Sequence, residues 1–403
     1  MTDAAFRNGP LADLRVIELG TLLAGPFCGQ LLGDLGAEVI KVEPPGQGDP
    51  LRQWGREQAS GKSLWWPVVA RNKKAITLDL RQSEGQELLR QLVAKTDFLL
   101  ENFRPGTLEK WGCGWEELSR INPRLIMIRV SGYGQTGPYA GRAGFGAVGE
   151  AMGGLRYVVG DPSTPPSRMG ISIGDSLAAT FACLGALSAL HYRERTGRGQ
   201  VVDSAIYEAV LAMMESLITE YDKAGYIRER TGAILPRIAP SNVYSTRDGE
   251  MVLIAANQDT VFGRLAQAMG QPELAKDPRY ATHIARGEHQ AELDALIGKW
   301  AGAHTRAEVL GVLEQFGVPS GLIYRAPEML ADAHFTARQA IVSVPHPDFG
   351  ELKMQNVAPK LSATPGSIRS PSPRLGEHND EVYRQILGLS AERLEELRAR
   401  KVV

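Results

Sequence analysis

Cysteine is scarce in this 403-residue sequence, which has only Cys28, Cys113 and Cys183. The three are far apart and form no Cys-x-x-Cys pair, which argues against a zinc site and against a disulfide framework. Such sparse use of cysteine is typical of a reducing cytoplasm, where we expect the protein to reside. Cys28 and Cys183 stand among apolar residues, so we expect them to be core residues rather than nucleophiles.

An excess of charge of either sign is also missing. Lys plus Arg number 45 and Asp plus Glu number 46, so the net charge is -1. This balance argues against nucleic acid as a partner, although a local basic patch for a small phosphorylated ligand is compatible with it. The N-terminal residues contain no apolar signal core, and no uninterrupted apolar run is long enough to span a bilayer. We therefore expect no membrane partner.

Several motifs of common enzyme classes are absent or incomplete. Gly61-Lys62-Ser63 resembles the end of a phosphate-binding P-loop, but position 56 holds arginine where that loop needs glycine. The turn after the first expected strand lacks the GxGxxG pattern, which makes a nicotinamide dehydrogenase the weaker alternative, although Glu43 stands where a ribose-binding acid often lies. HExxH and GxSxG are missing and the seven histidines are scattered, so we expect no metal site.

At this length the chain is expected to form two domains. The first part alternates between strand-like and helical periods, which predicts an α/β domain with a mainly parallel, Rossmann-like sheet. After about residue 225 a β-hairpin pattern and short helices predict a smaller α+β domain. The predicted parts are the large domain 1–200, a connecting helix 201–224, the small domain 225–325, and a return segment 326–403 that rejoins the large domain.

Periodicity also places the elements of the first domain. The predicted strands are Val16–Leu19, Ala37–Val42, Phe98–Leu100, Leu125–Val130 and Val201–Asp203. The predicted helices are Phe27–Leu35, Ser83–Lys95 with Ser83 as N-cap, and Ser176–Arg193. The first strand, helix and strand form a βαβ unit, which implies a right-handed crossover and parallel strands.

The stretch from Met169 to Ser176 is the most informative for chemistry. Asp175 comes directly before the expected apolar helix, where its carboxylate has two compatible roles. It is a suitable N-cap. The helix N-terminus also favours the ionised carboxylate, and the neighbouring glycines expose it and offer backbone N–H groups to an oxyanion, so that it is a suitable nucleophile.

Here the sequence resembles the class III CoA-transferases, a family that includes formyl-CoA, carnitine and succinyl-CoA:dicarboxylate CoA-transferases. The matching segments follow one another in order along nearly the whole chain, which is far more specific than any one motif. They are Leu14–Pro50, Arg71–Leu80, Glu101–Gly112, Ser131–Tyr139, Ile171–Ala179, Thr196–Ala209 and Pro373–His378. The family's nucleophilic aspartate falls on Asp175.

The resemblance implies an enzyme that moves CoA from an acyl-CoA to a carboxylic acid through a covalent aspartyl intermediate, without a prosthetic group or a metal. It also implies a homodimer of interlaced rings. The positions that match the family's contacts with CoA are Leu22, Leu23, Ala24, Leu78, Arg81, Asn102, Phe103, Lys110, Arg142 and Phe145. Lys110 and Arg142 are equally compatible with solvated surface charges.

Three departures from the family pattern bear on specificity. Leu23 replaces a glutamine, Gly146 replaces an acidic residue, and the glycine-rich tetraloop of oxalate-specific members is missing. The sequence is therefore closer to the dicarboxylate branch, with succinyl-CoA as the expected donor. A second substrate carboxylate would need a cation, for which Arg52, Arg71 and Arg168 are the candidates.

Two other functions remain open at this point. One is the related α-methylacyl-CoA racemase, whose chemistry needs a histidine where this chain has Phe145. The other is a non-catalytic protein that binds CoA or a nucleotide.

Overall fold

The structure is a computed structural model that describes residues 9–55, 58–59 and 61–403. The chain divides into two compact units. The first unit combines the chain up to Arg156 with Met169–Gly225 and Thr336–Val403. The second combines Tyr157–Arg168 with Tyr226–Phe335.

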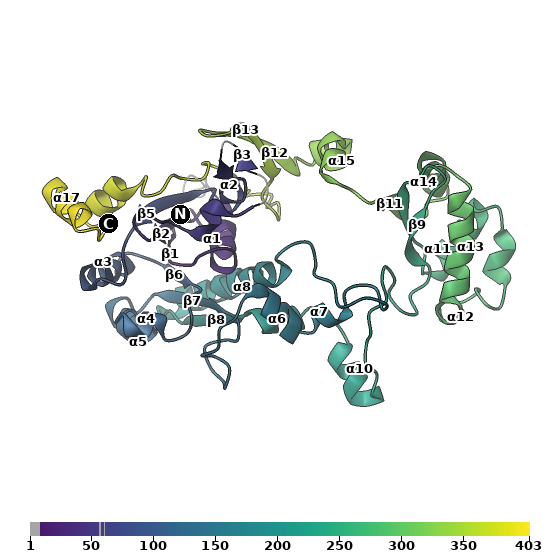
Figure 1. Ribbon diagram of the computed structural model, residues 1–403, viewed down its shortest axis with the longest axis horizontal. Coiled ribbons are helices and arrows are strands. Elements are labelled where there is room, and N and C mark those ends of the chain that lie inside the picture. The colour runs from purple at the N-terminus through teal and green to yellow at the C-terminus, as the bar shows by residue number, and fades with distance from the viewer. Residues whose placement is uncertain (1–8, 56–57, 60) are drawn as a thin grey trace. The chain divides into compact units, whose positions relative to one another are not determined.

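A six-stranded sheet forms the centre of the first unit (Figure 1). Its spatial order is β5-β2-β1-β6-β7-β8, and each neighbouring pair is parallel. The expected α/β fold with a parallel sheet is thus confirmed. The strands are β1 (Arg15–Glu18), β2 (Glu38–Glu43), β5 (Lys73–Thr77), β6 (Phe98–Glu101), β7 (Ile126–Ser131) and β8 (Val201–Ala205).

Helices cover both faces of this sheet, because each strand buries side chains on alternate sides. Helices α1 (Ala24–Asp34) and α8 (Ile173–Thr196) pack against each other, and α8 packs on β7 and β8. The core on the other face joins the strands to α3 (Ser83–Val93), α5 (Trp115–Ile121) and the C-terminal α17 (Ala391–Ala399). Helix α3 buries Leu88, Leu89, Leu92 and Val93, and Gln82 is its N-cap, whereas the predicted N-cap, Ser83, is its first helical residue.

Shorter elements complete the first unit. The stretch 201–224, predicted as a connecting helix, in fact comprises strand β8 and two helices. The further helices are α2 (Trp66–Val69), α4 (Thr107–Lys110), α6 (Gly146–Met152), α9 (Ile206–Leu211) and α10 (Leu217–Ala224), with single turns at Pro50–Gln53 and Glu381–Ile386. The small hairpins pair β3 (Gln58–Ala59) with β4 (Lys62–Ser63) and β12 (Ile341–His346) with β13 (Gly350–Gln355). Helices α7 (Leu155–Val158) and α16 (Ala333–Ala337) lie at the unit boundaries.

The second unit has its own core around a three-stranded antiparallel sheet of order β11-β10-β9. The predicted hairpin is confirmed, since β9 (Ser241–Ser245) pairs with β10 (Met251–Ala255) around the turn at Gly249. The third strand is β11 (Ser320–Leu322). The helices are α11 (Asp259–Ala268), α12 (His283–Glu288), α13 (Gln290–Gly302), α14 (Arg306–Gln315) and α15 (Ala326–Ala331), with a turn at Pro272–Lys276.

Helix α8 corrects one expectation from the sequence. By length and composition it is apolar enough to cross a membrane, although the sequence was expected to contain no such stretch. In the structure it contacts α1, α9, β7 and β8 of its own unit. Its alanines at 178, 182 and 186 are buried, and small side chains of this kind let helices and strands approach closely. We therefore interpret α8 as a core helix of the first unit.

Candidate active site

The loops that follow β1 and β6 meet at the carboxyl edge of the parallel sheet. From β1 the chain proceeds to β2 and β5 on one side, and from β6 to β7 and β8 on the other. The point between β1 and β6 is therefore the topological switch point, where ligands bind in open α/β sheets. Asn102 joins the two loops there: its Oδ1 accepts a hydrogen bond from the Thr21 N–H at 2.8 Å, and its Nδ2 donates to the Thr21 carbonyl at 2.9 Å.

This arrangement brings together residues that the sequence predicted as CoA contacts. Leu22, Leu23 and Ala24 follow Thr21 directly, and Phe103 follows Asn102. Leu22 and Leu23 are partly exposed, whereas Ala24 is buried at the start of α1. A ligand bound at this switch point would thus contact both loops.

Asp175 lies at the same edge of the sheet. Helix α8 leads through a short turn into the amino end of β8, and Arg193 near its C-terminus forms a 2.9 Å ion pair with Asp97, just before β6. The C-terminus of α8 is therefore at the amino edge, and its first turn, with Asp175, is at the carboxyl edge. Asp175 is the third residue of the helix and Ser172 is the N-cap, so Asp175 is not the N-cap itself.

The backbone of α6 leaves room for the Asp175 side chain. Gly146 is the first residue of α6, and a Cβ built there would lie 2.5 Å from Oδ2 and 2.8 Å from Oδ1 of Asp175. On the other side, the Gly174 N–H donates to the buried Glu150 carboxylate at 3.4 Å, and Arg156 forms an ion pair with Glu150 at 2.8 Å. The Asp175 carboxylate is thus half-buried. It lies against Gly146, and the neighbouring Gly174 is hydrogen-bonded to Glu150, whose charge is neutralised by Arg156.

Comparison with known proteins decides which chemistry this site serves. Residues 11–379 match the family described as CoA-transferase family III. The chain belongs to this family and is a CoA-transferase.

Relatives across the full length support the same assignment. The chain is 64% identical to a succinyl-CoA–D-citramalate CoA-transferase of Chloroflexus aurantiacus, over 98% of each chain. It is 36% identical to a succinate–glutarate CoA-transferase of Agrobacterium fabrum, over 96% of this chain and 98% of the relative. A crystal structure of a CAIB/BAIF family protein from Brucella suis has 36% identity and a TM-score of 0.83, covering 94% of this chain and all of that one.

The other predicted CoA contacts of this CoA-transferase are more dispersed. The Leu78 side chain belongs to the buried core. Arg81 is exposed and forms an ion pair with Asp79 at 2.9 Å. Lys110 ends α4 at the surface, Arg142 stacks over the Tyr139 ring at 3.7 Å, and the Phe145 side chain is exposed. Their contacts with CoA stay predictions.

The arginines considered for a second substrate carboxylate are placed very differently. Arg71 is buried, binds Asp34 through two nitrogens and donates to the Gln355 carbonyl at 2.6 Å, so it has no surface left for a substrate. Arg168 is exposed and lies in the second unit. Arg52 forms a two-point contact with the buried Glu43 carboxylate.

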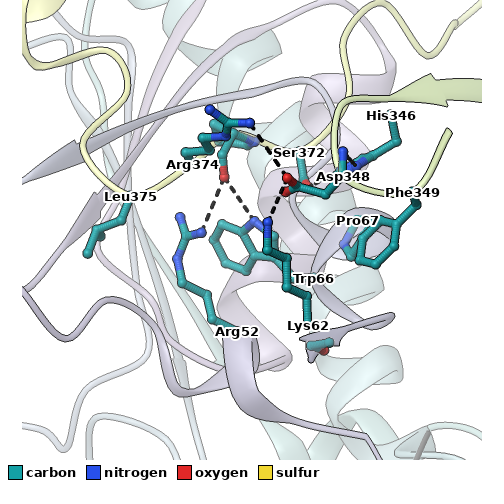
Figure 2. A pocket seen from close by; sticks show the side chains of 12 residues that line it. Arg52, Lys62, Trp66, Pro67, His346, Asp348, Phe349, Ser372, Arg374 and Leu375 are labelled. Atoms are coloured by element: carbon teal, nitrogen blue, oxygen red, sulfur yellow. Dashed lines mark hydrogen bonds and ion pairs between the residues drawn. The ribbon is translucent and has the colours of Figure 1, made fainter. Parts of the chain in front are cut away.

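Arg52 also lines a cavity of about 280 Å³ in this enzyme (Figure 2). The Arg52 guanidinium stacks over the Trp66 ring at 3.8 Å, and both side chains donate to the Pro373 carbonyl. Asp348, which also lines the cavity, pairs with Lys62 at 2.6 Å and with Arg374 at 3.6 Å. Each of these cations therefore has a partner inside the protein, and Asp175 does not line the cavity.

The cysteines play no part in this site. All three are buried, and burial raises the pKa of Cys28 well above its usual value and that of Cys183 to about 11. Both thiols therefore stay protonated and unreactive, as expected for core residues. Within the described residues no cluster of three or more His, Cys, Asp or Glu side chains is arranged to hold a metal ion.

Proposed function

We propose that this enzyme transfers CoA from succinyl-CoA to a dicarboxylic acid, with D-citramalate among its acceptors, through a covalent intermediate on Asp175. The observation that carries the proposal is the setting of Asp175: a half-buried carboxylate at the carboxyl edge of the sheet, with Gly146 leaving space directly beside its oxygens. The named relatives act on succinyl-CoA with D-citramalate or on succinate with glutarate, which supports the substrate class.

The proposed reaction begins when an Asp175 oxygen attacks the thioester carbonyl carbon of the donor. The C–S bond breaks, CoA leaves as thiolate, and a mixed anhydride remains on Asp175. The thiolate then attacks the Asp175 carbonyl carbon, which releases the donor as a free carboxylate and leaves an aspartyl-CoA thioester.

The acceptor completes the cycle by the reverse steps. Its carboxylate attacks the aspartyl thioester, which forms a second anhydride and releases the CoA thiolate again. The thiolate attacks the acyl carbon of the acceptor, forms the new thioester and restores the Asp175 carboxylate. Every intermediate keeps one activated acyl bond, either a thioester or an anhydride, so no ATP is needed, and no proton moves between the reacting groups.

The expected CoA site is the switch point between the loops after β1 and β6, where Leu22–Ala24 and Asn102–Phe103 lie. Arg81, Lys110 and Arg142 are exposed cations that we expect to bind the phosphates. Phe145 stands where a racemase of this fold needs a histidine, so proton abstraction from the α-carbon is the weaker alternative.

We also expect a cytoplasmic homodimer. Helix α10 buries none of its own side chains, and Ile218 and Tyr221 on it are more than half exposed. In the same unit, further large apolar side chains are exposed on α6, on α9 and just after α9, and exposed apolar surface of this kind marks protein contacts. These residues are Met152, Leu211 and Met213.

Asp175→Asn tests the mechanism. The amide keeps the shape of the side chain but is a poor nucleophile, so we expect exchange of labelled succinate into succinyl-CoA to fall to a trace. Wild-type enzyme incubated with succinyl-CoA and hydroxylamine should carry a hydroxamate on Asp175, detectable by peptide mass spectrometry. Substantial exchange by Asp175→Asn would exclude the aspartyl route.

The substrate class is tested separately on the wild-type enzyme. Succinyl-CoA is offered with D-citramalate, L-malate and glutarate, and with acetate and butyrate as monocarboxylates. We expect kcat/KM for the diacids to exceed that for the monoacids by about two orders of magnitude, because a site that hydrogen-bonds both carboxylates loses one set of these bonds with a monoacid. Comparable use of acetate would contradict the diacid assignment.

A further inference from the structure

Leu22, in the turn after β1, has a backbone conformation that is unfavourable for leucine. Its φ is +63°, in the left-handed region that favours glycine. Such a conformation persists only where the surroundings enforce it, and it occurs often at ligand sites. The Leu22 N–H is held by Asp49, whose carboxylate oxygens lie 3.1 and 3.3 Å from the nitrogen.

Asp49 is itself fixed by a buried network of charges. Lys41 pairs with it at 2.7 Å, and the N–H of Asp49 donates to Glu43 at 2.8 Å. The side chains of Asp49 and Lys41 are almost fully buried. Burial opposes both charges, yet Lys41 lowers the pKa of Asp49, and the carboxylates of Asp49 and Glu18 raise the pKa of Lys41. Both groups are therefore charged at neutral pH.

The same network forms hydrogen bonds with the backbone on both sides of the turn. The Lys41 ammonium donates to the Gly20 carbonyl before the turn, and the Lys73 ammonium donates to the Pro26 carbonyl after it, at 2.7 Å. Glu18 joins the two lysines, with 3.4 Å to Lys41 and 2.7 Å to Lys73. Together these contacts hold the turn from beneath, while Asn102 holds Thr21 from the side.

Helix α1 leaves space for this network. A Cβ at Gly29 would lie 1.8 Å from Glu18 Oε2, so only glycine at this position lets the carboxylate reach Lys73. Burying two lysines and two carboxylates is costly compared with an apolar core, and breaking one pair is costlier still. Stability alone therefore does not account for such a network directly under an exposed turn.

We infer that Asp49, held by Lys41, is a positioning residue for acyl-CoA: it fixes the Thr21–Ala24 turn in the conformation that binds the coenzyme. Asp49 acts through the backbone of Leu22 and does not itself touch the ligand. The inference rests on the proposed function in one respect, that CoA binds at the switch point between β1 and β6. It adds a residue 27 positions away from the turn to the determinants of acyl-CoA affinity.

Asp49→Asn is the first test, because the amide is isosteric but lacks the charge that pairs with Lys41. We expect KM for succinyl-CoA and the Kd of free CoA, measured by calorimetry, to rise about tenfold, equivalent to about 1.4 kcal/mol. We expect kcat and KM for the acceptor to change less than about threefold. A purely structural role would lower the fraction of folded enzyme, and with it the apparent kcat, but would leave KM unchanged.

Asp34→Asn is the matched control. Asp34 is equally buried and binds Arg71 through both oxygens, but it lies at the far end of α1 and does not contact the turn. We expect it to lower the melting temperature without changing KM for succinyl-CoA. An equal rise in KM for both variants, or no rise for Asp49→Asn, would overturn the inference.

Two variants of the turn decide the question if Asp49→Asn does not fold. Leu22→Pro leaves the buried charges intact but removes the N–H that Asp49 accepts and forbids a positive φ. Leu22→Ala removes only the side chain. We expect the proline variant to raise the Kd for CoA at least about fivefold more than the alanine variant, and equal effects would overturn the inference. If the wild-type enzyme neither binds CoA nor exchanges it, the proposed function itself fails.

Discussion

Gly146 lies directly against the carboxylate of Asp175, so that a single methyl group at position 146 would fall 2.5 Å from Oδ2. The two residues are 29 positions apart and come from the first turns of different helices, α6 and α8. Gly146 replaces an acidic residue of the family pattern, so the sequence alone did not predict what lies beside Asp175. In the structure Gly146 has no side chain, and the Asp175 carboxylate occupies the space that a side chain at position 146 would fill.

Gly146→Ala is therefore expected to impair the reaction more than the fold. The Asp175 carboxylate must turn away, since carbon and oxygen do not approach to 2.5 Å without a bond, and we expect kcat to fall by at least about a hundredfold, in line with a displaced catalytic group. Steady-state kinetics and a thermal melt measure both effects. Gly263→Ala, in open space on α11, is the control for the substitution itself. Unchanged kcat in Gly146→Ala would contradict the geometry.

Glu101 predicts how stability depends on pH. Burial raises the pKa of this carboxyl to about 7, against the opposing effects of Arg129 and the Phe103 N–H. The folded state therefore binds more protons than the unfolded state between about pH 4.5 and pH 7, and the free energy of unfolding should fall as pH rises through this window. Urea titrations across the window measure the slope.

Glu101→Gln should flatten that slope, because the amide does not titrate. Glu109→Gln is the control: Glu109 also pairs with Arg129, at 2.7 Å, but it is far more exposed and hydrogen bonds from Arg129 help to hold its pKa below the usual value. The ionised Glu109 carboxylate stabilises the folded state at pH values above the pKa of Glu109 in the unfolded chain, and this contribution is lost only as the pH falls. An unchanged slope in Glu101→Gln would show that another group is responsible.

Asn379 protects the edge strand β5. Its Oδ1 accepts from the Thr77 N–H at 2.9 Å and its Nδ2 donates to Thr77 Oγ1 at 2.7 Å, replacing the missing neighbouring strand. Asn379→Ala would leave a buried N–H unpaired, so we expect a loss of about 1–3 kcal/mol in the free energy of unfolding. Asp380→Ala removes only a surface ion pair with Arg398 and should cost less than about 1 kcal/mol. Urea unfolding distinguishes the two, and equal losses would refute the edge role.

The exposed face of α10 predicts the oligomeric state. If a second copy covers Ile218 and Tyr221, the charged variant Ile218→Glu should convert a dimer into a monomer, because an unpaired carboxylate is costly to bury. Light scattering measures the mass in solution. Ile284→Glu, at an even more exposed position on α12 in the second unit, is the matched control and should leave the mass unchanged. A wild-type monomer would exclude the dimer.

The sequence by itself determined the local elements and the type of chemistry. Alternating apolar patterns predicted β1, α1 and β2 to within two or three residues, because period and turn residues act over a short range. The glycine-rich stretch before a long apolar helix singled out Asp175 as a candidate nucleophile. The ordered series of matching segments predicted the family, which the comparisons confirm.

Only the tertiary structure decided where the charges go. Arg71 was a sequence-based candidate for binding a substrate carboxylate, yet it is buried with Asp34 as its partner, and Lys73 is buried with Glu18. The partners lie 37 and 55 positions away in the sequence. Their pairing depends on the strand order β5-β2-β1, which the pattern of each strand does not encode. The same holds for Asp49 and Leu22: the carboxylate acquires its role only because the folded chain brings to it a backbone N–H from 27 positions earlier in the sequence.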